Sequence, residues 1–267
     1  MTIKEQIIAA CESTKILSIH IAPKPDKPSG PIDSKFGGDY YLPAGAETAE
    51  LEFMAQINFA QVPHLDGFPE SGLLQFFLRT DAGAKGEFTE DRNAWLTDSG
   101  LFQVRWYPEL SENPAAEKAE VPEARWLTRS LAGRMEFQAA EEIATFSVGN
   151  DGLCTDMGFE AAEGLLPEDD MEDTEYDPGT EEGDERFFAD FGNWGCKLGG
   201  HPAIGWGDPR EVDDNYTIWK AYTALLFQLD LMPGKEYGQD VFGFFMKPED
   251  LAACRFNKVL MTRLNII

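Results

Sequence analysis

Two parts of the sequence carry the same landmarks in the same order, and this repetition limits the folds open to the chain more than any other feature. The segments pair as 35–38 (KFGG) with 197–200 (KLGG), 55–59 (AQINF) with 227–231 (FQLDL), 75–77 (QFF) with 243–245 (GFF), and Val104 with Val259. Ordered matches of this kind are typical of a duplicated unit, and such units usually stack or pack with pseudo-symmetry. We therefore expect an internal duplication.

The repeated segments have the patterns of β-strands. From Leu51 to Phe59 every second residue is apolar, which predicts a strand with one buried face. Residues 72–78 are almost continuously apolar, which predicts a strand buried on both faces. Shorter alternations centre on Val104 and Phe137. Together these patterns predict an α+β fold that is mainly antiparallel β-sheet, with internal duplication of one β-rich unit.

Under this interpretation the chain divides into four parts. Residues 1–30 begin with apolar residues at helical spacing, which predicts a short amphipathic helix, and end in a proline-rich stretch, which predicts an extended connector. Residues 31–155 form the first β-rich repeat unit, and residues 190–267 form the second. Residues 156–189 are expected to form an acidic linker between them.

Four motifs carry a family resemblance: residues 34–38 (SKFGG), 54–58 (MAQIN), 72–77 (GLLQFF) and 197–202 (KLGGHP). On these motifs the chain resembles the YwqG family of bacterial proteins, from about Pro31 to its C-terminus. The resemblance implies an internally duplicated, mainly antiparallel α+β structure and a cytoplasmic protein. It implies no activity, because the family is a domain of unknown function. Asp39 and Tyr40 stand where the family pattern has a proline, so we expect the first loop to differ in shape.

The sequence is strongly acidic. Its 48 Asp and Glu residues against 22 Lys and Arg give a formal net charge of −26. Nucleic-acid phosphates and anionic membranes are bound by clustered basic residues, so this charge argues against both as partners. It favours a basic protein or a cation instead. The sequence gives no signal for a particular oligomeric state.

Cysteine spacing and hydropathy indicate a cytoplasmic protein. The four cysteines form no Cys-x-x-Cys pair, so we expect reduced thiols rather than a zinc site or a redox centre. No run of about 18 apolar residues predicts a membrane span, and the first 20 residues lack the pattern of a signal peptide. Hydrophobic residues make up 43% of the chain, enough for a substantial core.

The segment from Glu160 to Glu185 is the most acidic part of the chain. It holds 13 acidic residues among 26 and no Lys or Arg, which predicts an exposed linker. One alternative is a cation site formed by Asp173, Glu175, Asp177 and Asp184. An EF-hand is not expected, because Pro178 stands where the calcium loop needs glycine. The other alternative is that the segment imitates a polyanion and docks on a basic partner.

A Gly-rich stretch contains the candidates for catalysis. His201 could act as a general base oriented by Asp208, with Cys196 as a nucleophile, and this defines a hydrolase hypothesis. The alternative is a tight turn between strands in which His201 is an ordinary, partly buried residue. The three histidines lack metal-ligand spacing and no cofactor motif occurs, so no cofactor is expected.

The candidate binding residues are polar side chains at matching places in the two predicted units. We hypothesise that they line a central groove between the units, together with two residues of the Gly-rich stretch. The set comprises Gln56, Asn58, Gln228, Asp230, His201 and Trp206. The alternative is that the amides bond to neighbouring backbone or water.

The leading functional hypothesis is a non-catalytic binding or interaction protein with a basic protein as partner. Duplication, acidity and the lack of catalytic motifs favour it. The alternatives are the hydrolase using His201 and Asp208 in a cleft between the units, and a divalent-cation binder acting through the acidic segment.

Overall fold

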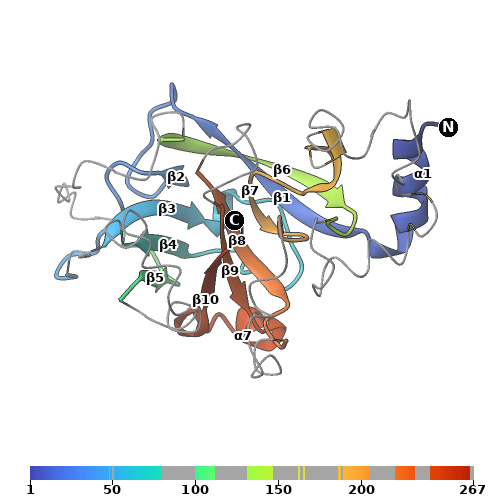
Figure 1. The fold of residues 1–267 in the computed structure, drawn as a ribbon. Coiled ribbons are helices and arrows are strands. Elements are labelled where there is room, and N and C mark those ends of the chain that lie inside the picture. The colour runs from blue at the N-terminus through green and yellow to red at the C-terminus, as the bar shows by residue number, and fades with distance from the viewer. Residues whose placement is uncertain are drawn as a thin grey trace.

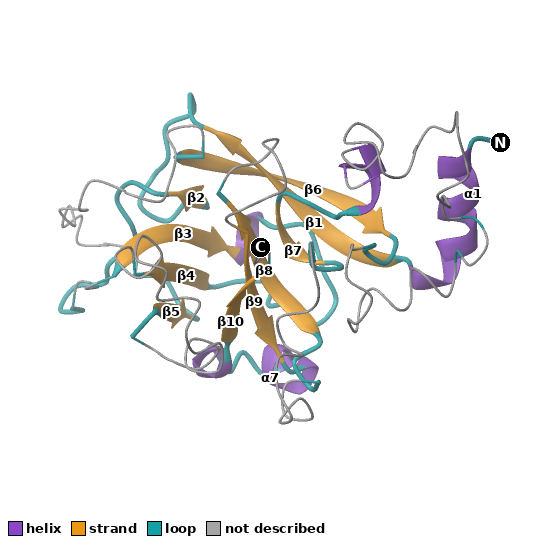
Figure 2. Cartoon of the chain, viewed as in Figure 1, coloured by secondary structure: helices purple, strands orange, loops and turns teal. Residues whose placement is uncertain are grey.

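The computed structural model describes residues 1–47, 49, 51–79, 100–111, 131–146, 162, 165, 186, 187, 189–204, 220–231 and 241–264. Within this part of the chain, ten strands form one antiparallel sheet accompanied by short helices (Figures 1 and 2). The strands are β1 (Ile16–Lys24), β2 (Lys35–Phe36), β3 (Glu52–Asn58), β4 (Leu73–Leu78), β5 (Phe102–Tyr107), β6 (Gly133–Glu142), β7 (Cys196–Gly199), β8 (Ala224–Asp230), β9 (Val241–Met246) and β10 (Leu260–Arg263). The helical elements include α1 (Ile3–Ala10), η1 (Cys11–Thr14), η2 (Phe59–Gln61), α7 (Pro248–Ala252) and η5 (Phe256–Lys258). The mainly antiparallel β fold is therefore confirmed.

Helix α1 confirms the helical pattern at the start of the chain. Thr2 caps it, and the Glu5 side chain bonds back to the Thr2 N–H to complete a capping box. Ile7 and Cys11 are fully buried in a small cluster with Phe146. No helix in the described residues has both the length and the hydropathy to cross a membrane.

The strand order places the longest pair of strands at the centre of the sheet. The order is β10-β9-β8-β7-β1-β6-β2-β3-β4-β5. Strands β1 and β6 pair along their length, from Ile16 opposite Glu142 to Lys24 opposite Arg134. On one side of this pair follows the meander β2–β5, and on the other side follows the meander β7–β10.

The expected connector in residues 1–30 is partly wrong, because β1 runs through Pro23 to Lys24. Proline is tolerated there for a structural reason. Strand β7 pairs with β1 only from Ser18 to Ile21, so beyond Ile21 the strand is paired with β6 alone. A missing N–H on an open side costs no ladder hydrogen bond.

The sheet curls until its two meanders pack against each other. The ring centroids of Phe76 in β4 and Phe227 in β8 are 4.6 Å apart, and those of Phe76 and Phe244 in β9 are 4.8 Å apart. Near the two sheet edges, the ring centroids of Trp106 in β5 and Phe256 in η5 are 4.8 Å apart. Both predicted units therefore contribute to one core, and Figure 1 shows β3–β5 lying beside β8–β10.

The strand pattern of residues 51–59 is confirmed as β3, but the prediction of one buried face is wrong. All seven residues of β3 are buried, because the preceding loop covers the second face, where Tyr40 and Leu42 pack with Phe53. A β-bulge between Phe53 and Ala55 also interrupts the alternation. Strand β4 is buried on both faces, as predicted.

One of the proposed sequence matches is displaced by two residues. Phe76 pairs with Val104 on β5, and Phe244 pairs with Met261 on β10, so the register partner that corresponds to Val104 is Met261. Val259 instead is the C-cap residue that follows the short helix η5 and precedes β10. The displacement keeps the same parity along the strand, which is why the sequence pattern looked alike.

Candidate functional site

A fully buried glutamine on β3 holds the loop around β2. Gln56 accepts a hydrogen bond from the N–H of Tyr41 at 2.9 Å. Its Nε2 donates to the carbonyls of Pro31 at 2.8 Å and Asp33 at 2.7 Å. The register partner of Gln56 on β2 is Lys35. Counted from that lysine, Tyr41 lies six residues after it, Pro31 four residues before it and Asp33 two residues before it.

A second buried glutamine, on β8, makes the same three bonds. Gln228 accepts from the N–H of Ala203 at 2.8 Å and donates to the carbonyls of Asn193 at 3.0 Å and Gly195 at 2.8 Å. Its register partner is Lys197, and the bonded residues have the same offsets from that lysine as in the first meander. Each glutamine fastens the turn around a short strand to the next strand of the sheet.

The residues beside the glutamines also match. The Ser34 hydroxyl accepts from the Asn58 N–H at 2.9 Å and donates to the Asn58 carbonyl at 3.4 Å. The Cys196 thiol makes the same pair of bonds with the backbone of Asp230, at 3.3 and 3.4 Å. The side chain of Asn58 donates to the carbonyl of Ile32, while that of Asp230 accepts from a backbone N–H.

The four polar residues predicted on β3 and β8 are therefore buried and bonded to the chain's own backbone. These bonds explain their positions without a ligand. Their role in a groove stays a prediction, and Trp206 lies outside the described residues.

A buried ion pair joins β6 to β7. Lys197 is fully buried, and its Nζ donates to the Glu142 carboxylate oxygens at 3.0 and 2.9 Å and also to the His201 carbonyl. The carboxylate accepts from the His201 N–H at 2.9 Å and contacts the Nε2 of half-exposed His20 at 2.7 Å. Gly200, with φ of +75°, allows this approach, because an added Cβ would collide with the carboxylate.

Burial and hydrogen bonding perturb the ionisable groups of this cluster. Burial alone would raise the pKa of Glu142, but hydrogen bonds from His20 and Lys197 and the charge of Lys197 lower that pKa overall. Burial lowers the pKa of His201 and raises the pKa of the Cys196 thiol. At neutral pH the Glu142 carboxylate is therefore ionised, while the imidazole of His201 and the Cys196 thiol are neutral.

The candidate base and nucleophile have structural partners. The His201 Nε2 lies 2.8 Å from the carbonyl oxygen of Thr14, which can only accept, so this nitrogen carries the hydrogen. The Cys196 thiol is held by the backbone of Asp230. Asp208 lies outside the described residues, so its pairing with His201 stays a prediction.

The proposed cation ligands Asp173, Glu175, Asp177 and Asp184 also lie outside the described residues. Where the chain is described, no group of three or more His, Cys, Asp or Glu side chains is arranged to hold a metal ion.

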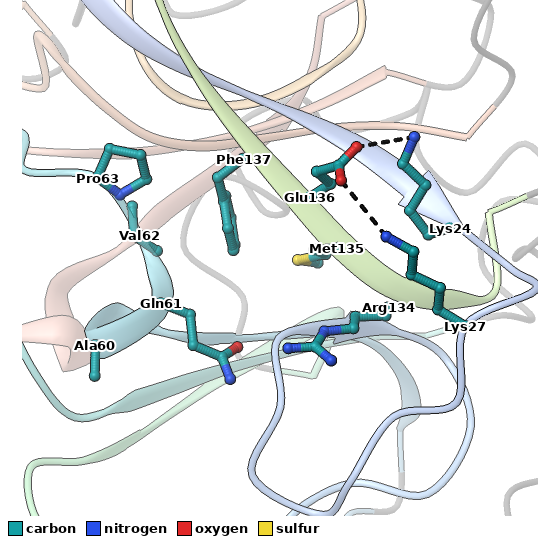
Figure 3. Close-up of a pocket in the computed structure, with 10 residues that line it drawn as sticks. All are labelled: Lys24, Lys27, Ala60, Gln61, Val62, Pro63, Arg134, Met135, Glu136 and Phe137. Atoms are coloured by element: carbon teal, nitrogen blue, oxygen red, sulfur yellow. Dashed lines mark ion pairs between the residues drawn. The ribbon is translucent and has the colours of Figure 1, made fainter.

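A cavity of about 520 Å³ opens on the surface beside β6 (Figure 3). Its walls come from the end of β1 and the following turn, from η2 and the residues after it, and from β6. The lining residues are Lys24, Lys27, Ala60, Gln61, Val62, Pro63, Arg134, Met135, Glu136 and Phe137. Consecutive residues of β6 line it, which places it along the edge of the strand rather than on one face.

The cavity exists because β2 is short. Strand β2 pairs with β6 only at Arg134 and Gly133, so the following residues of β6 have no described strand beside them on that edge. The Met135 N–H still reaches the Ser34 carbonyl at 3.0 Å. By the alternation of an antiparallel strand, the N–H of Phe137 points to the same edge. Sequence reasoning missed this site, because it is assembled from three distant segments.

These features define a class of β-protein. In its described residues a curled, ten-stranded antiparallel sheet contains two matched buried glutamines, Gln56 and Gln228, and carries a cavity with charged lining residues beside its central strands. The chain belongs to the family described as a domain of unknown function (DUF1963), which matches residues 34–263. The match begins just before β2 and ends with β10, so it includes both meanders. No curated protein is similar enough to match the chain.

Proposed function

We propose that this chain is a non-catalytic binding protein whose partner is a basic protein. The observation that carries the proposal is the formal charge of −26, half of which comes from the 13 acidic residues between Glu160 and Glu185. A field of this strength attracts positively charged surfaces and raises the rate of association.

The chemistry of the described polar residues supports a role without catalysis. A general base needs a free lone pair and a pKa near the operating pH, and a thiol nucleophile needs to be partly ionised to the thiolate. His201 donates its Nε2 hydrogen to a carbonyl, and burial raises the pKa of the Cys196 thiol. The thiol is therefore not prepared for attack on a substrate, and the imidazole, which is 6% exposed, has only its Nδ1 lone pair left to act as a base.

We further propose that the binding protein arose by internal duplication and is YwqG-like and cytoplasmic. The identical offsets of the bonds made by Gln56 and Gln228 support duplication, and so do the bulges, each of which leaves the second residue before the glutamine without a register partner. Cys196 and Cys254 are thiols that form no disulfide, which is the state expected in a reducing compartment.

Affinity capture followed by reconstitution tests the basic-partner proposal. The full chain is used as bait in lysate of its native host, and each captured protein is then purified and titrated by calorimetry. We expect a partner with a positive net charge whose affinity falls steeply as salt rises from about 0.05 to about 0.5 M, because the Debye length shrinks.

Two bait variants isolate the acidic segment. In the first, the 13 acidic residues between Glu160 and Glu185 become Asn or Gln, and in the second the same segment keeps its composition in shuffled order. The neutral variant should lose most of the affinity and the shuffled variant should keep it. Binding that survives both high salt and neutralisation would contradict the proposal, as would ester, phosphate or glycoside hydrolysis that His201→Ala abolishes.

A further inference from the structure

Three cationic side chains gather at the cavity beside β6, although basic residues are scarce in this chain. Lys24, Lys27 and Arg134 line it together with a single acidic residue, Glu136. The lining therefore carries a formal charge of +2 from these four groups, within a chain of net charge −26. A positive recess in a negative field is unsuited to the basic partner proposed above.

The cations are only partly neutralised. Glu136 pairs with Lys24 at 2.9 Å and more loosely with Lys27 at 3.6 Å, and Figure 3 shows one carboxylate oxygen directed at each ammonium group. Arg134 has one ion pair with the described residues, to Asp33 at 4.0 Å, which is beyond hydrogen-bond distance. Its guanidinium therefore has N–H donors to offer a ligand.

Apart from Gln61, the rest of the cavity lining is apolar. Val62 and Pro63 form one wall, and Figure 3 shows the ring of Phe137 on the side of β6 that faces them. Met135 is buried between these groups and the core. A volume of about 520 Å³ lies within the range of small-molecule sites, which combine an apolar lining with a few polar groups.

We propose that this cavity binds a small organic anion: a carboxylate or phosphate carried on an apolar body. The anionic group lies against Arg134 and Lys27, where the backbone N–H of Phe137 supplies a further donor. The apolar body lies against Phe137 and Val62. Charge-assisted hydrogen bonds select the anion, and burial of the apolar body adds affinity that a bare ion lacks.

Phenyl phosphate is the probe, because it contains both parts, and inorganic phosphate and benzyl alcohol each contain one. The full chain, labelled with nitrogen-15, is titrated with each compound while its amide resonances are followed. Phenyl phosphate should shift the amides of residues 134–137 with saturation and bind at least tenfold tighter than either half. Equal binding of all three, or shifts spread over the whole surface, would overturn the proposal.

Two substitutions that change the charge of the cavity lining in opposite directions test whether its residues bind the anion. Arg134→Met should weaken phenyl phosphate binding about tenfold, because it removes a charge-assisted hydrogen bond. Glu136→Gln should strengthen it several-fold, because it removes the competing carboxylate. Both side chains are about half exposed, so neither change should alter the unfolding temperature.

Matched controls lie at the other end of β1. Lys15, which is 27% exposed, and the exposed Glu12 form an ion pair at 2.6 Å, roughly 30 Å from the cavity by the rise of a strand. Lys15→Met and Glu12→Gln change the net charge by the same amounts and should leave binding unchanged. If Lys15→Met weakens binding as much as Arg134→Met does, the affinity for the anion depends on net charge alone, and the proposal of a site in the cavity is wrong.

Discussion

The buried ion pair of Lys197 and Glu142 makes a sharp prediction about stability. Replacing Lys197 with Met leaves a carboxylate that is 4% exposed without its main counterion. Breaking one partner of a buried pair costs about 3–5 kcal/mol, because the other charge stays buried and uncompensated. At about 2–4 °C per kcal/mol for a chain of this size, the unfolding temperature should fall by roughly 6–20 °C.

The corresponding lysine of the first meander provides the control. Lys35 is buried as well, but its Nζ donates only to the Gly30 carbonyl, and no carboxylate of a described residue lies within ion-pair distance. Burial lowers the pKa of Lys35, so its charge is already unfavourable there. Lys35→Met should therefore cost about 1 kcal/mol, the net value of one hydrogen bond.

A double-mutant cycle measured by urea unfolding completes the test. Glu142→Gln alone should also cost about 3 kcal/mol, because it leaves the buried ammonium group of Lys197 without a counterion. The double variant removes both charges, so its cost should fall short of the sum by about 2–3 kcal/mol. The reasoning is refuted if Lys197→Met costs no more than Lys35→Met, or if the two single costs simply add.

Three further predictions also concern stability, and the first two compare matched positions of the two meanders. Gly200→Ala should destabilise the chain far more than Gly38→Ala, since both glycines have positive φ but only at Gly200 would a Cβ meet the Glu142 carboxylate; thermal unfolding compares them. Gln56→Leu and Gln228→Leu should each cost about 3 kcal/mol in urea unfolding, because each strands two carbonyls and one N–H. The pKa of Glu142 is lower in the folded chain, so its stabilisation is present above its ordinary pKa of 4.5 and is lost as the pH falls below it; the decline should be shallower in Glu142→Gln.

Local periodicity predicted those strands whose environment is uniform along their length. Strand β4 is buried throughout, and its almost continuous run of apolar residues predicts this burial. Strand β3 shows where the same reasoning fails, because the loop that covers its outer face lies at another place in the sequence. The alternation predicts the strand, while burial depends on a tertiary contact that no short window contains.

The polar sites were predicted less completely, for a related reason. The repeated Gln56 and Gln228 are visible because they recur inside strand patterns. Glu142 stands at the end of β6 with no motif around it, and only the pairing of β6 and β7 with β1 brings it to Lys197. The cavity depends on the shortness of β2, which the sequence shows only as a Gly-Gly turn after two residues.

The central position of β1 has a consequence for biosynthesis. This strand leaves the ribosome well before its neighbour β7, which begins at Cys196, 172 residues after Lys24. At a synthesis rate of about 5–20 residues per second the interval is on the order of ten to thirty seconds. During that time the nascent polypeptide holds a strand with an open edge, which is a target for chaperones and for misassembly.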